Sequence, residues 1–400
     1  MTLTLLLDLD DTLLGTNLNT FMPAYFQALS NHLSARVSGD EMLRALIGGM
    51  SRMADNDDPR CTLENVFDSY FYPKVALTKD ELRDLVEDFY DDVFPTLAAL
   101  TTQLPEAIKF VEWAESRGVR IAIATDPLFP MKATRHRLRW AGFDPDQFEL
   151  VSAQEDFHFS KANPAYYAEV LGRIGWQDGP VLMVGNDPGR DILSAHRLGL
   201  KTYFIEDEST SSPGVEAGAG QLTDLRRWLE SIDLSALEPA FKSRDAILGI
   251  LSSTPAVLRH FLDSLPEEEL QRERARDDWA MIEIICHLRD TEREVHAMQL
   301  DRLLEKDDSF IPRPDAGVWA SERDYLTEDA RAAGAVFTDV RAEFLNKLKN
   351  VPDDLWLRKA RHAIFGPTNF LEVLSFAADH DRLHLQQAWK TMKTLPGERV

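Results

Sequence analysis

The chain has 400 residues, and its 44 basic against 67 acidic side chains give a formal net charge of −23. This charge argues against nucleic-acid binding, which needs a basic surface to displace counterions, and against docking on anionic membranes. The length predicts two or three domains, and an apolar fraction of 44% is enough to form hydrophobic cores.

The start of the chain is apolar from Leu3 to Leu7 but reads as a buried strand. It lacks the basic start and small-residue cleavage site of a signal peptide, and no apolar run reaches the roughly 18 residues that a membrane span needs. Cys61 and Cys286 are the only cysteines, which excludes a disulfide framework. We therefore expect an intracellular, cytoplasmic protein.

The first half of the chain alternates short apolar runs with amphipathic stretches. Runs of this length are typical of strands that are covered on both faces. The alternation predicts an α/β fold with a doubly wound parallel sheet. The predicted strands are 3–7, 119–124, 148–152, 181–185 and 201–205, and the predicted helices between them are 105–116, 131–141, 164–174 and 191–198.

A long helical stretch interrupts this rhythm after the first strand. Its clearest helices are Phe21–Leu33, Gly39–Leu46 and Asp80–Val93. We interpret residues 16–100 as a helical cap inserted between core segments 1–15 and 101–233. Within the cap, the Gly-rich segment Gly48–Asp57 is predicted as a loop, either in contact with substrate or a plain connection between helices.

Strand signals disappear in the last part of the chain. Residues 206–220 are rich in Gly and Ser and are predicted as a loop, followed by a last core helix over 221–232 and a linker over 234–240. From there to residue 400, four long amphipathic stretches predict a four-helix bundle. They cover 241–262, 279–304, 327–348 and 370–392.

Polar groups that suit phosphate chemistry follow four of the predicted strands. Ligands bind at the carboxyl ends of strands in open α/β sheets, so these groups are expected to meet. Two carboxylates at spacing two supply a nucleophile and an acid–base group. The groups are Asp8 with Asp10, Thr125 with Asp126, Lys161, and the acids of Gly185–Asp191.

In this order the four motifs resemble the haloacid dehalogenase-like hydrolases, and the inserted helices resemble the cap of their small-molecule phosphatases. The resemblance implies Mg²⁺-dependent hydrolysis of a small phosphorylated metabolite. Asp8 would attack phosphorus, and Asp10 would protonate the leaving alcohol and then activate water. Thr125, Asp126 and Lys161 would bind the phosphoryl group.

The implied Mg²⁺ ligands are Asp8, the backbone carbonyl of Asp10, and acids of the fourth motif. Here the chain departs from the family pattern, because Asn186 takes the position of the usual first Asp. We predict Asp187 and Asp191 as ligands, with Asn186 as the alternative. The usual Lys-Pro of the third motif is Lys161-Ala162, for which we expect only a local backbone effect.

Three histidines form a second candidate site in the predicted bundle. His380 and His384 are four residues apart, so they share one helix face and can bind a transition metal. Two solvated histidines on a charged helix are the alternative. His287, on another predicted helix, supplies a third imidazole; the remaining histidines lack a partner at ligand spacing.

The three histidines and their helical setting resemble the DinB-like family of four-helix bundles, as do the segments Arg276–Trp279 and His380–Gln386. The resemblance implies Zn²⁺, Ni²⁺ or Fe²⁺ on His287, His380 and His384, with an open position for water or substrate. Two further hypotheses stay open. Either the bundle is a metal-dependent thiol transferase or binding module and the first half its scaffold, or the bundle only regulates or forms a homodimer.

Overall fold

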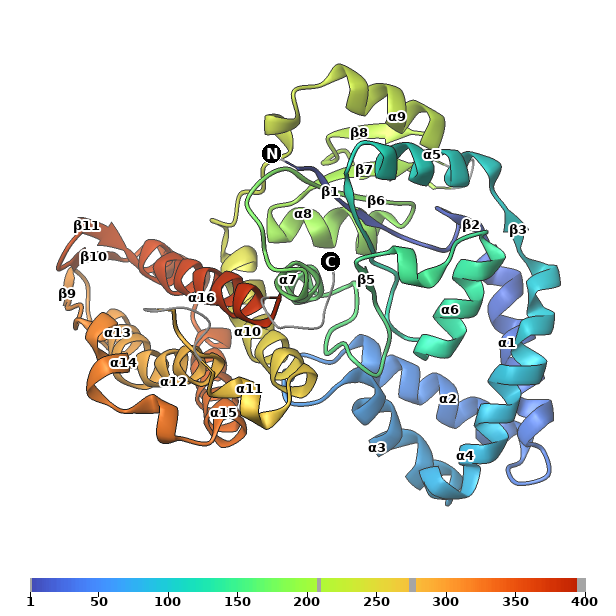
Figure 1. Cartoon of the computed structure of the whole chain (residues 1–400), viewed down its shortest axis with the longest axis horizontal. Helices are drawn as coiled ribbons and strands as arrows, with labels where there is room; N and C mark the ends of the chain where they lie inside the picture. Colours follow the sequence, from blue (N-terminus) through green and yellow to red (C-terminus); the bar gives the residue numbers. More distant parts are fainter. Residues whose placement is uncertain (1, 207–209, 273–277, 394–400) are drawn as a thin grey trace. The chain divides into compact units, whose positions relative to one another are not determined.

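The computed structural model describes residues 2–206, 210–272 and 278–393, which form two compact units (Figure 1). The first unit contains the chain up to Asp57, Cys61–Val170 and Asp178–Ala240. The second contains Asp58–Arg60, Leu171–Gln177 and the chain from Phe241 onward. No helix of the described residues is both long and apolar enough to cross a membrane.

The first unit is built on a parallel six-stranded sheet in the order β5-β4-β1-β6-β7-β8. Its strands are β1 (Thr4–Leu7), β4 (Arg120–Ile123), β5 (Leu150–Val151), β6 (Val181–Gly185), β7 (Lys201–Ile205) and β8 (Gly218–Gly220). The first of these in the chain lies in the middle, between β4 and β6. The strand order therefore reverses at β1, which is where ligands bind in such sheets.

Helices connect these strands and cover the sheet. They are α5 (Pro105–Ser116), α6 (Met131–Trp140), α7 (Pro164–Arg173), α8 (Ala195–Leu198) and α9 (Leu222–Ser231). Every residue of β1 and β6 is buried, which explains why these strands are continuous apolar runs rather than alternating ones. The predicted α/β core with a parallel sheet is confirmed.

The prediction of a loop through 206–220 is wrong at its end, where β8 extends the sheet. A side chain on Gly218 would lie 3.0 Å from the rings of Tyr203 and Trp228. The glycine therefore allows the edge strand to pass beneath two aromatic rings. A Gly-Ala-Gly sequence carries no strand propensity, so sequence reasoning missed it.

The inserted cap consists of α1 (Leu18–Leu33), α2 (Gly39–Ala54), α3 (Leu63–Val75) and α4 (Lys79–Asp88), followed by helical turns to Leu100. It joins the core through an antiparallel pair, β2 (Leu14–Gly15) and β3 (Thr102–Gln103). The predicted loop at Gly48 is wrong, because α2 continues to Ala54. A Cβ on Gly48 or Gly49 would meet the rings of Tyr70 and Phe67 at 2.5 and 2.6 Å, so these glycines serve close helix packing.

The second unit is the predicted helical bundle. Its long helices are α10 (Arg244–Ser264), α12 (Met281–Thr291), α13 (Ala297–Glu305), α15 (Ala330–Lys349) and α16 (Phe370–Lys393), and its short ones are α11 (Glu267–Leu270) and α14 (Trp319–Glu322). A π-helical turn over residues 292–296 joins α12 to α13. Helices α10 and α12 each pack against both α15 and α16.

The bundle also carries a small sheet that sequence reasoning missed. Its strands are β9 (Ser309–Ile311), β10 (Lys359–His362) and β11 (Gly366–Asn369), in the order β11-β10-β9. They have three or four residues each, which is too short for a period-two pattern to stand out. The expectation that strands end near residue 241 is therefore wrong.

Candidate catalytic and metal sites

Asp8 lies directly after the central strand β1. Its backbone N–H donates to the carbonyl of Val184 on β6 at 2.9 Å, which continues the parallel pairing and fixes the start of the loop. Its carboxylate is buried and accepts a hydrogen bond from Lys161 Nζ at 2.6 Å. Lys161 also pairs with the buried Asp191. The structure thus brings three predicted site residues together around one ammonium group.

Burial dominates the electrostatics of this cluster. Desolvation raises the pKa of Asp8 to about 8, against the lowering effect of Lys161, and the nearby carboxylates of Asp191 and Asp10 raise it further. Burial also raises the pKa of Asp191, and Lys161 again opposes the shift. Burial disfavours the charge of Lys161, but the two carboxylates outweigh it and hold its pKa well above the usual range. The cluster thus places two buried carboxyl groups on one ammonium group.

Asp10 is held by two donors. Its Oδ1 accepts from the Thr16 hydroxyl at 2.8 Å, and its Oδ2 accepts from Arg137 Nη1 at 2.5 Å. Arg137 is buried and stacks on the ring of Phe129, with 4.3 Å between the guanidinium carbon and the ring centroid. Sequence reasoning missed Arg137. The available signal was an arginine on the apolar stripe of a predicted helix, between Ala133 and Ala141.

Thr125 and Asp126 follow β4. The backbone N–H of Ala124 donates to the carbonyl of Leu7 at 2.8 Å, so the carboxyl ends of strands β1 and β4 lie side by side. The Thr125 side chain is buried. Asp126 accepts from the backbone N–H of Lys161 at 3.2 Å, and burial raises its pKa. Asp126 thus supports the backbone of the lysine.

The polar side chains of the fourth motif, Asn186, Asp187 and Asp191, have different hydrogen-bond partners. Asp187 Oδ1 accepts from the backbone N–H groups of Gly189 and Arg190 at 2.8 and 2.9 Å, so it caps the following turn. Asn186 Oδ1 lies 3.5 Å from the Thr12 hydroxyl, in the loop that carries Asp10. Asp191 is buried and accepts from the backbone N–H of Asp187 at 3.0 Å. Asp191 is therefore part of the cluster, Asn186 lies against the loop that carries Asp10, and Asp187 caps the next turn.

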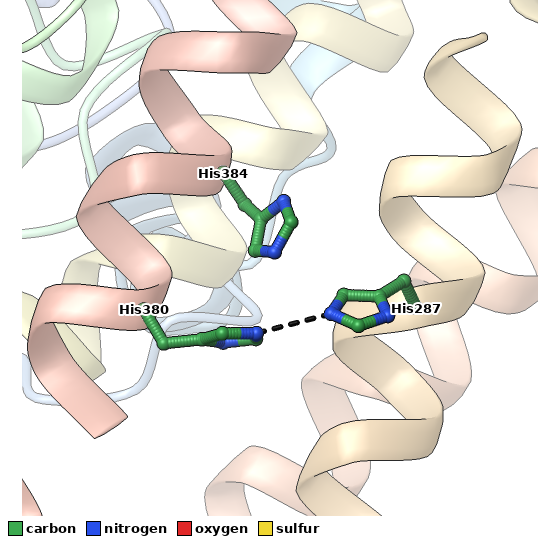
Figure 2. Close-up of side chains that lie close together, drawn as sticks. All are labelled: His287, His380 and His384. Carbon is green, nitrogen blue, oxygen red and sulfur yellow. Dashed lines mark hydrogen bonds between the residues drawn. The ribbon is translucent and has the colours of Figure 1, made fainter. Parts of the chain in front are cut away.

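The three histidines of the bundle meet between α12 and α16 (Figure 2). One ring nitrogen from each of His287, His380 and His384 lies within 4.8 Å of the others, a spacing that suits a shared metal ion. His287 Nε2 and His380 Nε2 are 3.0 Å apart. Two like nitrogens at this distance need either one proton between them or a cation.

The environment of the triad keeps the imidazoles neutral. Burial lowers the pKa of His287 to about 3 and that of His380 well below its usual range, and the neighbouring histidines add to both shifts. Burial also lowers the pKa of His384. Neutral imidazole is the form that binds metals, so the site is prepared for a cation at neutral pH.

Side chains around the triad orient only part of it. Gln387 Oε1 accepts from His384 Nδ1 at 2.9 Å if that nitrogen carries the proton, which leaves Nε2 free. The Trp279 indole stacks on His384 at 5.7 Å between ring centroids. Within the described residues, the Nδ1 atoms of His287 and His380 have no hydrogen-bond partner. Of the segment Arg276–Trp279 predicted to precede the site, Arg276 and Asp277 lie outside the described residues.

His296, one of the histidines without a partner at ligand spacing, is buried next to the triad. Its Nδ1 pairs with Glu292 at 2.9 Å, and its ring packs on His380 at 5.5 Å. Glu292 in turn binds Arg341, which also binds Asp381. Through these buried ion pairs, Arg341 on α15 connects the π-helical turn after α12 with α16, and α12 and α16 carry the three histidines.

Comparisons with known proteins agree with this division. Residues 2–199 match the family model of haloacid dehalogenase-like hydrolases, and residues 250–388 match that of the DinB superfamily. A curated relative, the phosphoserine phosphatase of Thermus thermophilus, is 25% identical over 119 residues. The match covers 28% of this chain and 47% of the relative, so the chain spans about half the length of that relative.

Solved structures resemble each part separately. One is a phosphatase of the haloacid dehalogenase group from Thermococcus onnurineus, at 22% identity and a TM-score of 0.39 over 57% of this chain and 98% of that one. The other is YfiT from Bacillus subtilis, a four-helix bundle, at 18% identity and a TM-score of 0.34 over 38% and 88%. The chain thus consists of a haloacid dehalogenase-like hydrolase domain fused to a domain of the DinB superfamily.

Proposed function

We propose that the first unit is a Mg²⁺-dependent phosphatase that hydrolyses a small phosphorylated metabolite through an aspartyl-phosphate on Asp8. The observation that carries this proposal is the buried Lys161 ammonium between the carboxylates of Asp8 and Asp191. A fixed cation beside a nucleophilic carboxylate suits the transfer of a charged phosphoryl group. The local similarity to a phosphoserine phosphatase supports the same class of reaction.

The proposed reaction has two steps, the formation and the hydrolysis of the aspartyl-phosphate. In the first, an Asp8 oxygen attacks phosphorus, the bond to the ester oxygen breaks, and Asp10 gives a proton to the leaving alcohol. In the second, Asp10 takes a proton from water, whose oxygen attacks phosphorus and releases phosphate and the Asp8 carboxylate. Thr125 and Lys161 bind the phosphoryl oxygens throughout.

The donor set of the site fits Mg²⁺, which prefers hard oxygen ligands. The carboxyl groups of Asp8 and Asp191 are buried side by side at Lys161, and burial, together with the nearby acids, raises the pKa of Asp8 to about 8. We assign the ion to Asp8, Asp191, the backbone carbonyl of Asp10 and Asn186. We now prefer Asn186 to Asp187, because Asp187 caps a turn. Bound Mg²⁺ would offset charge on the phosphoryl oxygens.

Phosphate release from a panel of phosphomonoesters, with and without Mg²⁺, tests this proposal. We expect Mg²⁺-dependent turnover that Asp8→Asn abolishes, and Asp92→Asn, an exposed cap residue, should leave it unchanged. Trapping of ³²P on the wild type but not on Asp8→Asn would identify the covalent intermediate. Turnover that survives in Asp8→Asn would contradict the assignment of the nucleophile.

We also propose that His287, His380 and His384 bind a divalent transition metal, Zn²⁺, Ni²⁺ or Fe²⁺. The carrying observation is the convergence of three neutral imidazole nitrogens within 4.8 Å. Metal analysis of purified protein should find about one equivalent, lost in His380→Ala/His384→Ala and kept in His196→Ala, whose side chain is exposed. Equal metal content in all three proteins would refute the site.

Phosphate release by His380→Ala/His384→Ala shows whether the two candidate sites act independently or are coupled. Loss of the transition metal with unchanged phosphate release indicates that the two domains act independently. A second candidate function applies if well-folded wild type releases no phosphate from any ester. The bundle would then be the active part, as a metal-dependent thiol transferase or binding module, and the metal content of the histidine variants would be the first readout.

A further inference from the structure

A cavity between the cap helices and the core lies outside the phosphoryl site. It measures about 170 Å³ and is lined by residues of α1 to α4, by the turn that follows α4, and by two core loops near residues 130 and 155. Asp8, Asp10, Thr125 and Lys161 are not among its lining residues. Phe129 forms part of its wall and also packs on Arg137, which binds Asp10. The cavity is therefore next to the catalytic carboxylates but separate from them.

The walls of this cavity are aromatic and aliphatic. Six aromatic residues line it, together with leucines and two methionines. The aromatic residues are Tyr25, Phe67, Phe71, Tyr72, Tyr90 and Phe129. An apolar cavity of roughly 150 Å³ is large enough for benzene. The size and lining thus fit a ligand with one six-membered aromatic ring.

Each lysine and arginine that lines the cavity is paired with acids, whereas Glu155, which also lines it, accepts the backbone N–H of Met131 at 2.9 Å. Lys79 binds Glu64 and Asp68, Lys132 binds Glu87 and Asp91, and Arg83 binds Asp80. A phosphate or carboxylate would have to break one of these pairs to gain a cation. The cavity therefore favours a neutral ligand over the phosphorylated substrate.

A buried pair of tyrosines supplies a hydrogen-bond donor in the wall. The hydroxyls of Tyr25 and Tyr90 lie 2.9 Å apart, so one donates to the other. The hydroxyl that accepts keeps its own proton, and the described residues offer no acceptor within hydrogen-bonding distance for it. Burial raises the pKa of both hydroxyls, that of Tyr25 to about 12, so they remain protonated. A ligand oxygen at this point would satisfy the spare donor.

We propose that the cap contains a second binding site, for a small neutral aromatic molecule that accepts a hydrogen bond from the Tyr25–Tyr90 pair. The site is independent of phosphate chemistry and does not require the phosphatase activity proposed above. The cavity volume, its aromatic walls and the tyrosine donor together fit molecules of the size and polarity of phenol.

Binding of two fluorinated probes of equal size, measured by ¹⁹F NMR on the full chain, tests this proposal. The probes are 4-fluorophenol, which has an oxygen, and 4-fluorotoluene, which has a methyl group in its place. We expect both to bind and to compete for one site. Probes that do not bind to wild type, or that bind without competing, would overturn the proposal without any variant.

Two variants on the same helix then locate the site. Leu46→Trp places an indole in the cavity wall and should abolish binding, whereas Ile47→Trp, at an exposed position of α2, should leave it unchanged. Equal binding by both variants would overturn the location. Phosphate release is not part of this readout, so the failure of one proposal is distinguishable from the failure of the other.

The tyrosine pair makes a sharper prediction about the donor. Removal of one hydroxyl leaves the other with a free proton, so Tyr25→Phe and Tyr90→Phe should each retain the affinity for 4-fluorophenol relative to 4-fluorotoluene. The double variant removes the donor, and this ratio should fall roughly fivefold, the worth of one net hydrogen bond. An unchanged ratio in the double variant would overturn the role of the pair.

Discussion

Replacement of Arg341 by Met should destabilise the bundle more than any surface charge change. The guanidinium donates to both oxygens of Glu292, at 2.7 and 3.0 Å, to both oxygens of Asp381, at 2.6 and 3.3 Å, and to the carbonyl of Leu251 at 2.8 Å. The side chains of all three charged residues are fully buried. Without the cation, both carboxylates remain buried, and of the two only Glu292 keeps a partner, the His296 imidazole.

The structure gives two estimates of the magnitude. Removal of one partner from a buried ion pair costs about 3–5 kcal/mol. Independently, burial raises the pKa of Glu292, but Arg341 and His296 outweigh it and lower the pKa to about 2 from the usual 4.5. A shift of that size corresponds to roughly 3 kcal/mol at neutral pH. We therefore expect Arg341→Met to lower the unfolding free energy of the bundle by about 3–5 kcal/mol.

The pH dependence has a definite sign. Because the pKa of Glu292 is lowered in the folded state, its contribution is complete above 4.5 and is lost as the pH falls toward 2. In Arg341→Met, protonation of the two carboxylates removes their uncompensated charge, so the folded bundle becomes less destabilised as the pH falls. The difference in unfolding free energy between wild type and variant should therefore be largest near pH 7 and shrink below pH 4.5.

Hydrogen exchange of the full chain, read by mass spectrometry over α12, α15 and α16, measures this difference locally. The matched control is Arg331→Met on α15, whose partners Asp263 and Glu267 are exposed and which should cost less than about 1 kcal/mol. Replacement of all three buried charges by apolar residues should recover at least about 2 kcal/mol. Equal effects of the Arg331 and Arg341 variants would refute the reasoning.

Three further outcomes follow from the sites. Lys161→Met, which removes the cation between two buried carboxylates, should lower kcat/KM for phosphate release at least ~100-fold, and a smaller loss would contradict its role. Gly185→Ala should weaken Mg²⁺ binding measured by calorimetry while the fold is kept, because its Cβ would overlap the Asp191 carboxylate; unchanged affinity would exclude Asp191 as a ligand. Burial raises the pKa of Cys286 to about 12, so a thiol reagent at pH 8 should label only the half-exposed Cys61 in native protein and both thiols after unfolding.

The sequence predicted those elements whose pattern is set by burial alone. The central strands are apolar because both their faces are covered, and the four long stretches of the bundle show the period of a helix because one face is covered. Elements that depend on a partner were missed. Gly218–Gly220 is a strand only because β7 offers its edge, and Gly48 and Gly49 continue a helix only because the rings of α3 need the space.

The candidate sites divide in the same way. Motif order was enough to place Asp8, Lys161 and Asp191 together, because strand ends meet at one edge of a parallel sheet. It could not distinguish Asn186 from Asp187, since that choice depends on which side chain caps the next turn. Arg137 was missed because its partner, Asp10, lies far away in the chain.

The central position of β1 constrains the order in which the protein can fold during its synthesis. Leu7 pairs with Ile123 on one side and with Val184 on the other. At roughly 5–20 residues per second, the ribosome needs on the order of 10–35 s to proceed from Leu7 to Val184. The helices of the cap, whose contacts are local, emerge complete during that interval. Asp8 is thus among the first residues made, but β1 cannot complete its pairing until Val184 has been synthesised. Until then β1 is an apolar segment with at least one unpaired edge, to which a chaperone can bind.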